Sequence, residues 1–537
     1  MNSQNIILLF AFVIIIHLRP AAATTLHVPD EYSTIQAAVV AASATGDVIE
    51  VSGGTYDEAV SIYGKQLDIV GVDGMQSTTV TRIIWGNPAE DPYCGGSLTG
   101  FNIAASLAAE QLKQEFRLRA SQVQNSVLIS AAGPYAGGDE NSIHVESCHF
   151  LGDVTIDQYN YYEAATVDSC TFENASLHGG SELGFDVSSC TFHNGGIVVA
   201  GEVVSIEGNV VVGSVGIYIH IDSLGGVIAG NVVDGGGIEA VGWADLFVSD
   251  NVVKECIVGI NTTDATYFPV VNNNDVSHCD TGITCSDESI VTNNLVWSCI
   301  DGIILDGWFV ELRGNTVVDC SGDGVRWSSS SERITEISCN IIVGNGSGVT
   351  VTAGADIDLL SCNDVWNNLG GNWFGIINPT GVDGNISVDP LFCGPHLADY
   401  TLGAASPCLP GNHPDGAPCG LIGKLGQGCD DPADVPEGDA EGMQSWIRLS
   451  KSTPNPTMGC VKYSVNLRDS GPVRINVYDV NGRIVDTLIQ HWLSAGSHEF
   501  SWDPRSNNDR ELNSGVYYLR MEAGRQRATR KIVLINN

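Results

Sequence analysis

The segments "NNDVSHCDTGI" (residues 273–283) and "NNLVWSCIDGI" (residues 293–303) share one pattern, and this pattern decides the fold. In both, an asparagine is followed by a short apolar run, a cysteine five positions later, and a glycine before an isoleucine. Related segments recur along the chain, with their key asparagines 20 to 25 residues apart: Asn209, Asn231, Asn251, Asn274, Asn294, Asn315, Asn340 and Asn363. A repeat of about 22 residues is typical of a solenoid, in which each unit buries its apolar face against its neighbours.

The repeating unit is too short for a pair of helices, and Gly and Asn interrupt its brief apolar runs. Such a unit fits one coil of a parallel β-helix with about three strands. Equivalent residues on successive coils then lie about 4.8 Å apart. Asn tolerates a left-handed turn, and stacked side-chain amides can bond to the coils above and below. We therefore expect the eight asparagines to form an internal structural ladder and not a catalytic group.

The cysteines of the repeat also stand in register. Four of them follow a ladder asparagine by five residues: Cys256, Cys279, Cys299 and Cys320. Side chains stacked in one column project in parallel at a spacing too wide for a disulfide, and a straight row of sulfurs does not form a tetrahedral metal site. We expect buried free thiols that fill space as small apolar groups.

Three earlier segments extend the repeat toward the N-terminus: "ESCHF" (146–150), "DSCTF" (168–172) and "SSCTF" (188–192). Their cysteines are expected one residue before the ladder position, and their phenylalanines are expected to form a stack. The residues expected in the ladder column are then His149, Thr171 and Thr191.

Four further cysteines lie in a Gly- and Pro-rich segment where the repeat has ended: Cys393, Cys408, Cys419 and Cys429. Such a segment has little core of its own, so disulfides are expected there in an exported protein. Three pairings are open. We favour Cys393–Cys408 with Cys419–Cys429.

Charge is distributed unevenly between the two ends of the chain. Residues 1–445 contain 11 Lys and Arg against 55 Asp and Glu, whereas residues 446–537 contain 13 against 8. The acidic body excludes nucleic acid and anionic membrane surfaces as partners. It suits an extracellular protein that binds divalent cations, with Ca²⁺ as the candidate cofactor.

The composition predicts four segments. Residues 1–23 contain an apolar run of 11 residues followed by three alanines, which fits a signal peptide, although no Lys or Arg precedes the run. Residues 24–428 hold the β-helix, and the acidic, Pro- and Gly-containing residues 429–445 predict a linker. Residues 446–537 show period-two alternation and predict about seven strands in a small β-sandwich. No later segment is apolar enough to cross a membrane.

The start of the body predicts a helix that covers the first coil. Ser33 or Thr34 can cap this helix, and Ile35, Ala38, Val39 and Ala42 then share one face. The string "STIQAAVVAA…GDVIEVSGGTYDE", together with the later Asn and Cys columns, resembles the pectin-lyase-like superfamily of right-handed parallel β-helices. The resemblance covers roughly residues 26–420. It implies a fold but no single activity, because the superfamily includes lyases, hydrolases, epimerases and adhesins.

The C-terminal segment is similar to the sorting domains of type IX secretion substrates and to the related Ig-like domain of flagellar hook-capping proteins. The matching strings are "PNP" (454–456), "VYDVNGRIV" (477–485) with its Asn481-Gly482 turn, Ala495-Gly496, Trp502-Asp503, "SGVYYLR" (514–520), Thr529 and Lys531. This resemblance implies that residues 446–537 engage secretion machinery. The protein is then secreted or held at the outer surface of a bacterial cell. A plain accessory sandwich is the alternative.

A candidate catalytic site appears when the coils are aligned on the glycine that follows the Cys column. Asp301 and Asp323 then neighbour each other on consecutive coils, and Arg326 is the basic residue of that column. Two close carboxylates can raise the pKa of one of them or bind a cation. The resemblance to superfamily polysaccharide lyases implies that such acids would hold Ca²⁺ against a uronate and that the arginine would take the proton next to the carboxylate. Three further residues within reach are candidate ligand-binding groups: His278, Asp280 and Asp306.

Two functions remain open. The leading hypothesis is a binding or structural protein that presents a β face to polysaccharide or to another cell-surface component. The alternative is a polysaccharide lyase or glycoside hydrolase with Asp301, Asp323 and Arg326 at its centre. The polygalacturonase motifs are missing, and Lys and Arg are scarce in the repeat, which favours the first hypothesis. Ordinary Asp–Gly turns with surface ion pairs also explain the three charged residues.

Overall fold

The computed structural model shows two compact units, residues 1–434 and residues 435–537, which are described separately. The first unit is described for residues 23–43, 45–86, 95–112, 116–131, 142–158, 165–327, 333–351 and 356–430. The second is described for residues 447–449, 461–467, 471–478, 484–493, 496–502, 512, 515–523 and 526–534. Nearly all of the predicted signal peptide and linker therefore lies outside the described residues.

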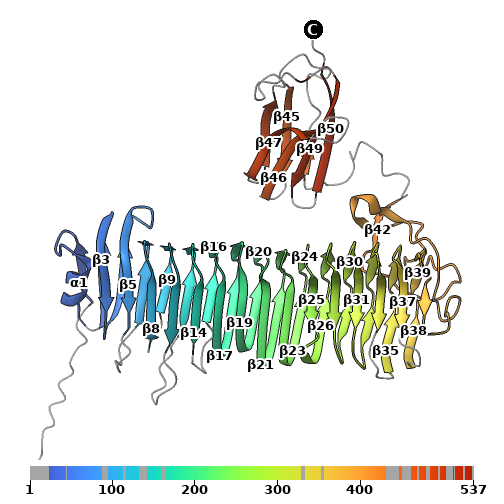
Figure 1. Cartoon of the computed structure of the whole chain (residues 1–537), viewed down its shortest axis with the longest axis horizontal. Helices are drawn as coiled ribbons and strands as arrows, with labels where there is room; N and C mark the ends of the chain where they lie inside the picture. Colours follow the sequence, from blue (N-terminus) through green and yellow to red (C-terminus); the bar gives the residue numbers. More distant parts are fainter. Residues whose placement is uncertain are drawn as a thin grey trace, which may run out of the picture. The chain divides into compact units, whose positions relative to one another are not determined.

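The first unit is a parallel β-helix, as the repeat predicts (Figure 1). Each coil contributes one strand to each of three sheets, which we number by their order after the Asn column. Sheet 1 of the later coils contains β20 (Val210–Val212), β22 (Val232–Asp234), β24 (Val252–Lys254), β27 (Asp275–Ser277), β30 (Leu295–Trp297), β33 (Thr316–Val318), β36 (Ile341–Val343) and β39 (Asp364–Trp366). Every neighbouring pair in this series is parallel.

Sheets 2 and 3 complete each coil. Sheet 2 contains β25 (Val258–Thr262), β28 (Thr281–Cys285), β31 (Asp301–Leu305), β34 (Asp323–Trp327), β37 (Ser347–Val351) and β40 (Trp373–Phe374). Sheet 3 contains β26 (Ala265–Asn272), β29 (Ile290–Thr292), β32 (Glu311–Arg313), β35 (Arg333–Ser338) and β38 (Asp356–Ser361). In the middle coils one long strand passes through both sheets: β17 (Leu177–Ser188), β19 (Gly196–Glu207), β21 (Gly216–Ala229) and β23 (Ile238–Ser249).

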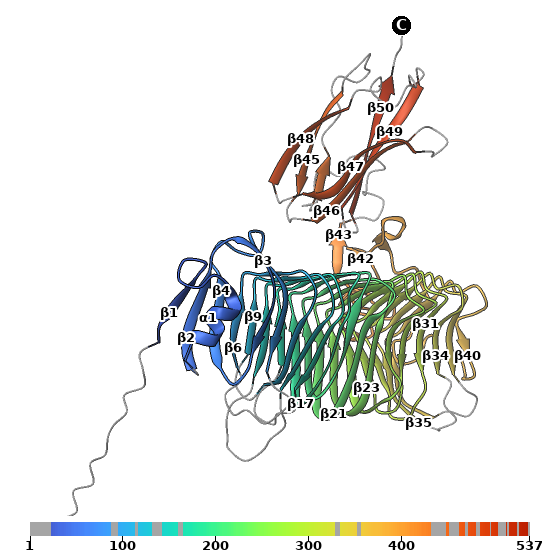
Figure 2. The same ribbon diagram turned by 60° about the vertical axis from the view of Figure 1, so that its left-hand side comes forward.

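The earlier coils contain the same three sheets (Figure 2), and β5 runs through two of them because it pairs with both β7 and β8. Their elements are β1 (Thr25–Val28), β2 (Thr45–Val51), β3 (Gly54–Ile62), β4 (Gln66–Gly71), β5 (Thr78–Trp85), β6 (Gly95–Thr99), β7 (Asn102–Ile103), β8 (Leu107–Leu112), β9 (Phe116–Arg119), β10 (Gln122–Val123), β11 (Val127–Ala131), β12 (Ile143–Glu146), β13 (His149–Phe150), β14 (Val154–Gln158), β15 (Ala165–Asp168), β16 (Thr171–Glu173) and β18 (Thr191–His193). Inward side chains of all three sheets form one continuous apolar core.

The predicted Asn ladder runs through the core. From Asn231 onward, the Oδ1 atom of each ladder residue accepts bonds from both the backbone N–H and the side-chain amide of the preceding one. For Asn294, the acceptor from Asn274, these N···O distances are 2.9 and 3.0 Å. The side chains of all eight predicted members are at most 1% exposed, and Asn385 extends the ladder by one residue. The left-handed turn falls on the residue before each ladder asparagine, as at Asn273 (φ 58°) and Asn293 (φ 54°).

The prediction for the earlier coils is wrong by one residue. Thr191 pairs with Val210, so Cys190 aligns with Asn209 and not with the residue before it. The N–H of Cys190 donates to Asn209 Oδ1 at 2.9 Å, which places the thiol in the ladder column itself. The same holds for Cys148 and Cys170, whereas His149, Thr171 and Thr191 point outward on the sheet. The expected phenylalanine stack is present, since the rings of Phe172 and Phe192 lie 4.3 Å apart.

The predicted second column of thiols is confirmed. Cys256, Cys279, Cys299 and Cys320 are free and buried. The thiols of Cys279 and Cys320, together with burial, raise the pKa of Cys299. At its C-terminal end this column also changes from thiols to amides, because Cys320 N–H donates to Asn345 Oδ1 at 2.9 Å and Asn345 bonds Asn368 in the same way.

The predicted N-terminal helix is α1 (Ile35–Ala41), which buries Ile35, Ala38 and Val39 against the first coil. Thr34 is its N-cap and accepts a bond from Ala37 N–H at 3.1 Å. Glu58 accepts from the N–H groups of Ile35 and Gln36 at 2.9 and 3.0 Å. Lys65 Nζ donates to the carbonyls of Val39 and Ala42 at the other end. An anion at the N-terminus and a cation at the C-terminus stabilise this short helix.

A non-repeating cap, residues 386–430, covers the outer face of sheet 1 on the last coils. It contains β41 (Phe392–Gly394), a 3₁₀ turn (Pro395–Leu397), β42 (Asp399–Gly403) and β43 (Gln427–Cys429). A second apolar core forms between the two layers from the outward residues of sheet 1 and from the cap: Leu295, Val318, Ile341, Val343, Ile386, Tyr400, Leu402, Cys408, Cys419 and Ile422. Lys424 Nζ reaches Asn274 O at 2.9 Å, so the cap extends back over several coils.

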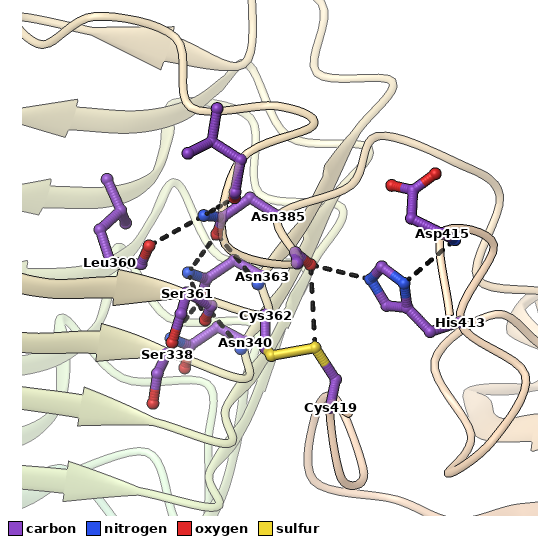
Figure 3. The surroundings of a disulfide bond; sticks show 12 residues. Ser338, Asn340, Leu360, Ser361, Cys362, Asn363, Asn385, His413, Asp415 and Cys419 are labelled. Carbon is purple, nitrogen blue, oxygen red and sulfur yellow. Dashed lines mark hydrogen bonds between the residues drawn. A yellow bond between two sulfur atoms is a disulfide. The ribbon is translucent and has the colours of Figure 1, made fainter. Parts of the chain in front are cut away.

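The predicted disulfide pairing is wrong. The bonds are Cys362–Cys419 and Cys393–Cys429, whereas Cys408 is free and buried. Figure 3 shows the first bond beside ladder residues Asn363 and Asn385. Cys362 occupies the left-handed turn position before Asn363 (φ 56°), and its bond to Cys419 fastens the cap to the coil.

Burial of Asp364 under the cap gives the unit a pH-dependent stability. This burial raises the pKa of Asp364 to about 6, although the carboxylate accepts bonds from Val388 N–H at 3.1 Å and from the Cys408 thiol at 3.3 Å. A carboxyl with a raised folded-state pKa stabilises the fold at low pH, and this contribution is lost as the pH rises through about 6. We expect the free energy of unfolding to fall by up to about 3 kcal/mol between about pH 4 and pH 7.5 because of this group.

Denaturation curves across that pH range measure this effect. Asp364→Asn keeps an acceptor for Val388 N–H, so the variant should have a flatter pH profile and the exposed control Asp415→Asn should retain the wild-type slope. An unchanged slope in Asp364→Asn would contradict the assignment.

The second unit is a small sandwich of two antiparallel sheets, as predicted. One sheet contains β44 (Ile447–Leu449), β45 (Val461–Leu467) and β48 (Gly496–Trp502). The other contains β46 (Gly471–Tyr478), β47 (Ile484–Leu493), β49 (Gly515–Ala523) and β50 (Gln526–Leu534). The core includes Val465, Ile475, Leu519 and Ile532. The predicted Asn481-Gly482 turn lies outside the described residues.

Candidate functional site

The structure brings the three candidate catalytic residues together on the outer face of sheet 2. Asp301 and Asp323 are the first residues of β31 and β34, and Arg326 is the fourth residue of β34. The guanidinium lies 3.0 Å from Asp301 Oδ2 and 3.4 Å from Asp323 Oδ2. The register of a parallel sheet produces this contact, because the outward positions of neighbouring coils coincide.

Other bonds hold the two carboxylates in this closed arrangement. Asp301 Oδ1 accepts from Asp323 N–H, and Asp323 Oδ1 accepts from the Thr350 hydroxyl, both at 3.0 Å. Gly322 leaves room for the Asp301 carboxylate, since a Cβ atom there would lie 2.4 Å from its Oδ1. The side chains are 18 to 37% exposed. The Arg326 guanidinium is thus engaged by both carboxylates, and the three charged groups pair within the cluster.

Of the three candidate ligand-binding residues, His278 and Asp306 are separate from this cluster, whereas the carbonyl of Asp280 accepts a bond from Asp301 N–H at 2.9 Å. His278 packs edge-on against Trp297 of sheet 1, at a centroid distance of 4.7 Å. Asp280 is exposed in the turn before β28. Asp306 follows the last residue of β31, so it lies about 16 Å along the strand from Asp301.

No group of three or more His, Cys, Asp and Glu side chains arranged to hold a metal ion occurs among the residues that the structure describes. Asp301 and Asp323 are therefore a carboxylate pair joined to Arg326, and the expectation of Ca²⁺ stays a prediction.

Exposed aromatic side chains gather where sheet 2 passes into sheet 3. We call them the aromatic strip, with these members and exposed fractions: Trp243 (66%), Phe247 (49%), Phe268 (52%), Trp308 (46%) and Phe309 (40%). Exposed large aromatic groups on one face of a soluble protein mark a binding surface more often than isolated apolar residues do.

Strand alternation accounts for the first part of the strip. β23 alternates buried and exposed residues, so Trp243, Asp245 and Phe247 all face outward. In the next coil Tyr267 pairs with Asp245 and Val270 pairs with Phe247, so this strand holds one extra residue between the two pairs. Phe268 (φ 37°) lies in the resulting bulge and is exposed beside them. β21, β23 and β26 follow one another along the solenoid (Figure 1).

The second part of the strip lies two coils further along. Leu305 pairs with Cys285, and Cys285 pairs with Thr262, so Trp308 follows in the same corner. Asp287 Oδ1 accepts from Trp308 N–H at 2.9 Å and fixes this turn. The rings of Trp308 and Phe309 lie 5.3 Å apart. Three coil steps separate β23 from Trp308, about 14 Å along the axis.

Reasoning from the sequence did not predict the strip. The alternation of β23 could have indicated it, because "EAVGWADLF" (239–247) places an aromatic residue at two outward positions. Trp308 and Phe309 lie in a turn, where a sequence pattern does not define which way a side chain faces.

No helix among the described residues meets the length and hydropathy needed to cross a membrane.

Two family models match parts of the chain. The periplasmic copper-binding protein family NosD matches residues 206–372, which hold the ladder coils and the aromatic strip. The FlgD Ig-like domain matches residues 459–527 in the second unit. No curated protein sequence matches the chain.

Solved structures give remote similarities. The periplasmic alginate epimerase AlgG is 11% identical, with 62% of this chain and 78% of that chain covered and a TM-score of 0.30. The A-module of the Azotobacter vinelandii mannuronan C-5 epimerase AlgE6 is 14% identical, with 66% and 94% covered and a TM-score of 0.23. These scores are too low to transfer a site or an activity. The chain is a parallel β-helix protein with a FlgD-type Ig-like domain at its C-terminal end.

Proposed function

We propose that this protein is exported and binds polysaccharide along the aromatic strip. The observation that carries the proposal is the gathering of five exposed aromatic side chains within four coils. The C–H faces of sugar rings pack on such aromatic faces, and a row of them suits a chain of sugars better than a single ligand.

The solenoid supports this function because it holds the first part of the strip on a paired strand. Phe247 pairs with Val227 and Val270, and Trp243 follows Gly242, which pairs with Ile221 and Ala265. Binding groups on regular strands lose little conformational freedom when the ligand binds, so more of the contact energy appears as affinity.

We further propose that residues 446–537 direct secretion or attachment at the outer cell surface, after a signal peptide at residues 1–23 has been removed. Residues 429–445 then serve as the linker between this module and the β-helix of residues 24–428. The Ig-like match and the resemblance to type IX sorting domains support this assignment.

Trp243→Ala and Trp308→Ala test the binding proposal. Each substitution is expected to weaken polysaccharide binding about tenfold or more, because each removes one stacking surface. Affinity electrophoresis against a panel of soluble polysaccharides, followed by calorimetry on the ligand found, measures the change. Tyr63→Ala, which removes an aromatic residue of 47% exposure in a distant coil, is the matched control. Equal binding by all four proteins would refute the proposal.

The alternative function is a polysaccharide lyase or glycoside hydrolase centred on Asp301, Asp323 and Arg326. The proximity of the three residues on adjacent coils favours this function. The ion pairs of Arg326 with Asp301 and Asp323 oppose it, because they already occupy the charged groups. We expect no depolymerisation by the wild-type protein, with or without Ca²⁺, in a screen that detects new reducing ends and unsaturated products. Turnover by the wild type that disappears in Asp323→Ala would establish the enzyme instead.

A further inference from the structure

We propose that the polysaccharide bound at the aromatic strip is built from amino sugars and carries positive charge. This inference rests on the proposed function and specifies its ligand.

Carboxylates are interleaved with the strip. Asp245 faces outward between Trp243 and Phe247 on β23. Asp264 is exposed in the turn before β26, and Asp287 is exposed in the turn of the following coil. A sugar ring stacked on the aromatic faces therefore places its ring substituents beside carboxylates.

Cations are scarce on the same coils. Lys254 is the sole Lys or Arg from residue 201 to residue 312 of the sequence. It lies on sheet 1, where its Nζ is 2.7 Å from Asp234 Oδ2, and so belongs to another face. A polyuronate would bring one carboxylate per sugar onto this surface with no opposite charge to meet it.

The direct charge partner of these carboxylates is a protonated amine. Each exposed ion pair contributes little alone, but a polymer with an amino group on every sugar engages several carboxylates at once. Such attraction also speeds the encounter and weakens as salt is added. Aromatic stacking supplies the salt-independent part of the affinity.

Calorimetry with three hexasaccharides tests the inference. They are the hexamers of glucosamine, of N-acetylglucosamine and of galacturonate. Measurements at about pH 5.5 keep the amines and the carboxylates charged. The glucosamine hexamer is expected to bind about tenfold more tightly than the N-acetylated one at low salt, and this difference should shrink at physiological salt. Galacturonate is expected to bind most weakly, with Ca²⁺ present as well as without it.

Isosteric variants identify the residues responsible. The double variant Asp245→Asn/Asp287→Asn keeps an acceptor for Trp308 N–H and should lose the preference for the charged hexamer. Glu207→Gln, an exposed acid two coils before β23, is the control and should keep the preference.

The outcomes separate the two proposals. If all three hexamers bind with equal, Trp243-dependent affinity, the charge inference fails and polysaccharide binding stands. Tightest binding of galacturonate with Ca²⁺ also overturns the inference. If no hexamer binds and sedimentation shows Trp243-dependent self-association, the strip is a contact between copies and both proposals fail.

Discussion

Replacing Asn294 by alanine is expected to lower the free energy of unfolding of the β-helix unit by on the order of 5 kcal/mol. Asn294 Nδ2 donates to Asn315 Oδ1 at 3.0 Å and to Val271 O at 2.8 Å. Its Oδ1 accepts from Asn274 N–H and from the Asn274 side chain. All of these groups are buried, and each buried polar group left without a partner costs about 1–3 kcal/mol.

Such a loss approaches the whole stability of many domains, so the variant should be largely unfolded or insoluble at physiological temperature. Urea denaturation followed by far-UV circular dichroism measures it. Asn293→Gly is the matched control: the neighbouring residue is exposed and left-handed, and glycine already occupies that turn position at Gly208, Gly230 and Gly314. The control should differ from wild type by less than about 0.5 kcal/mol. Equal stability of the two variants would refute a structural ladder.

Removing the Cys362–Cys419 bond is expected to release the cap from the last coils. The bond closes a sequence separation of 57 residues, so its loss should reduce stability by roughly 2–4 kcal/mol. The double variant Cys362→Ser/Cys419→Ser avoids a leftover thiol. Hydrogen exchange should rise in residues 386–425 and around Trp297, whose ring lies 5.9 Å from that of Tyr400 in the cap.

The control for this experiment is Cys339→Ser, which removes a free, half-buried thiol from the equivalent turn of the preceding coil. Its exchange pattern should match that of the wild type. Peptide mapping without reduction should recover a peptide that joins Cys362 to Cys419. Recovery of Cys393 joined to Cys408 would show that the pairing in the structure is wrong.

The repeat made the fold predictable, because a ladder residue identifies itself by recurring at one spacing. The same signal could have revealed Asn345 and Asn368, which follow ladder asparagines by five residues as the cysteines do. The one-residue error at Cys190 arose because this cysteine was assigned to the turn position that precedes the ladder. In the structure Ser189 takes the left-handed turn, at φ 55°.

The cap was not predictable in the same way. It has no period, and its contacts join residues far apart in sequence, such as Lys424 and Asn274. A pairing drawn from the Gly- and Pro-rich segment alone therefore omitted Cys362, which belongs to a coil. Short-range spacing carries no information about where such a segment folds back.

The candidate site was predictable only where it followed the register. Asp301 and Asp323 occupy one column, and the structure places both against Arg326. Asp306 lies five residues after Asp301 and His278 lies one coil earlier, but a coil turns between its sheets within a few residues. Proximity in sequence therefore did not become proximity in space.

The uniform ladder has a consequence for how such a chain changes length. The ladder residues between its two ends make the same bonds to their neighbours, as Asn274 and Asn294 do. If the segment between two consecutive ladder asparagines is duplicated or deleted, the chain is rejoined at equivalent backbone positions. Each ladder amide then again has its hydrogen-bond partners. The β-helix can grow or shrink by single coils, each adding about 4.8 Å of surface, without altering its two ends. The length of the β-helix can therefore change during evolution by one whole coil at a time.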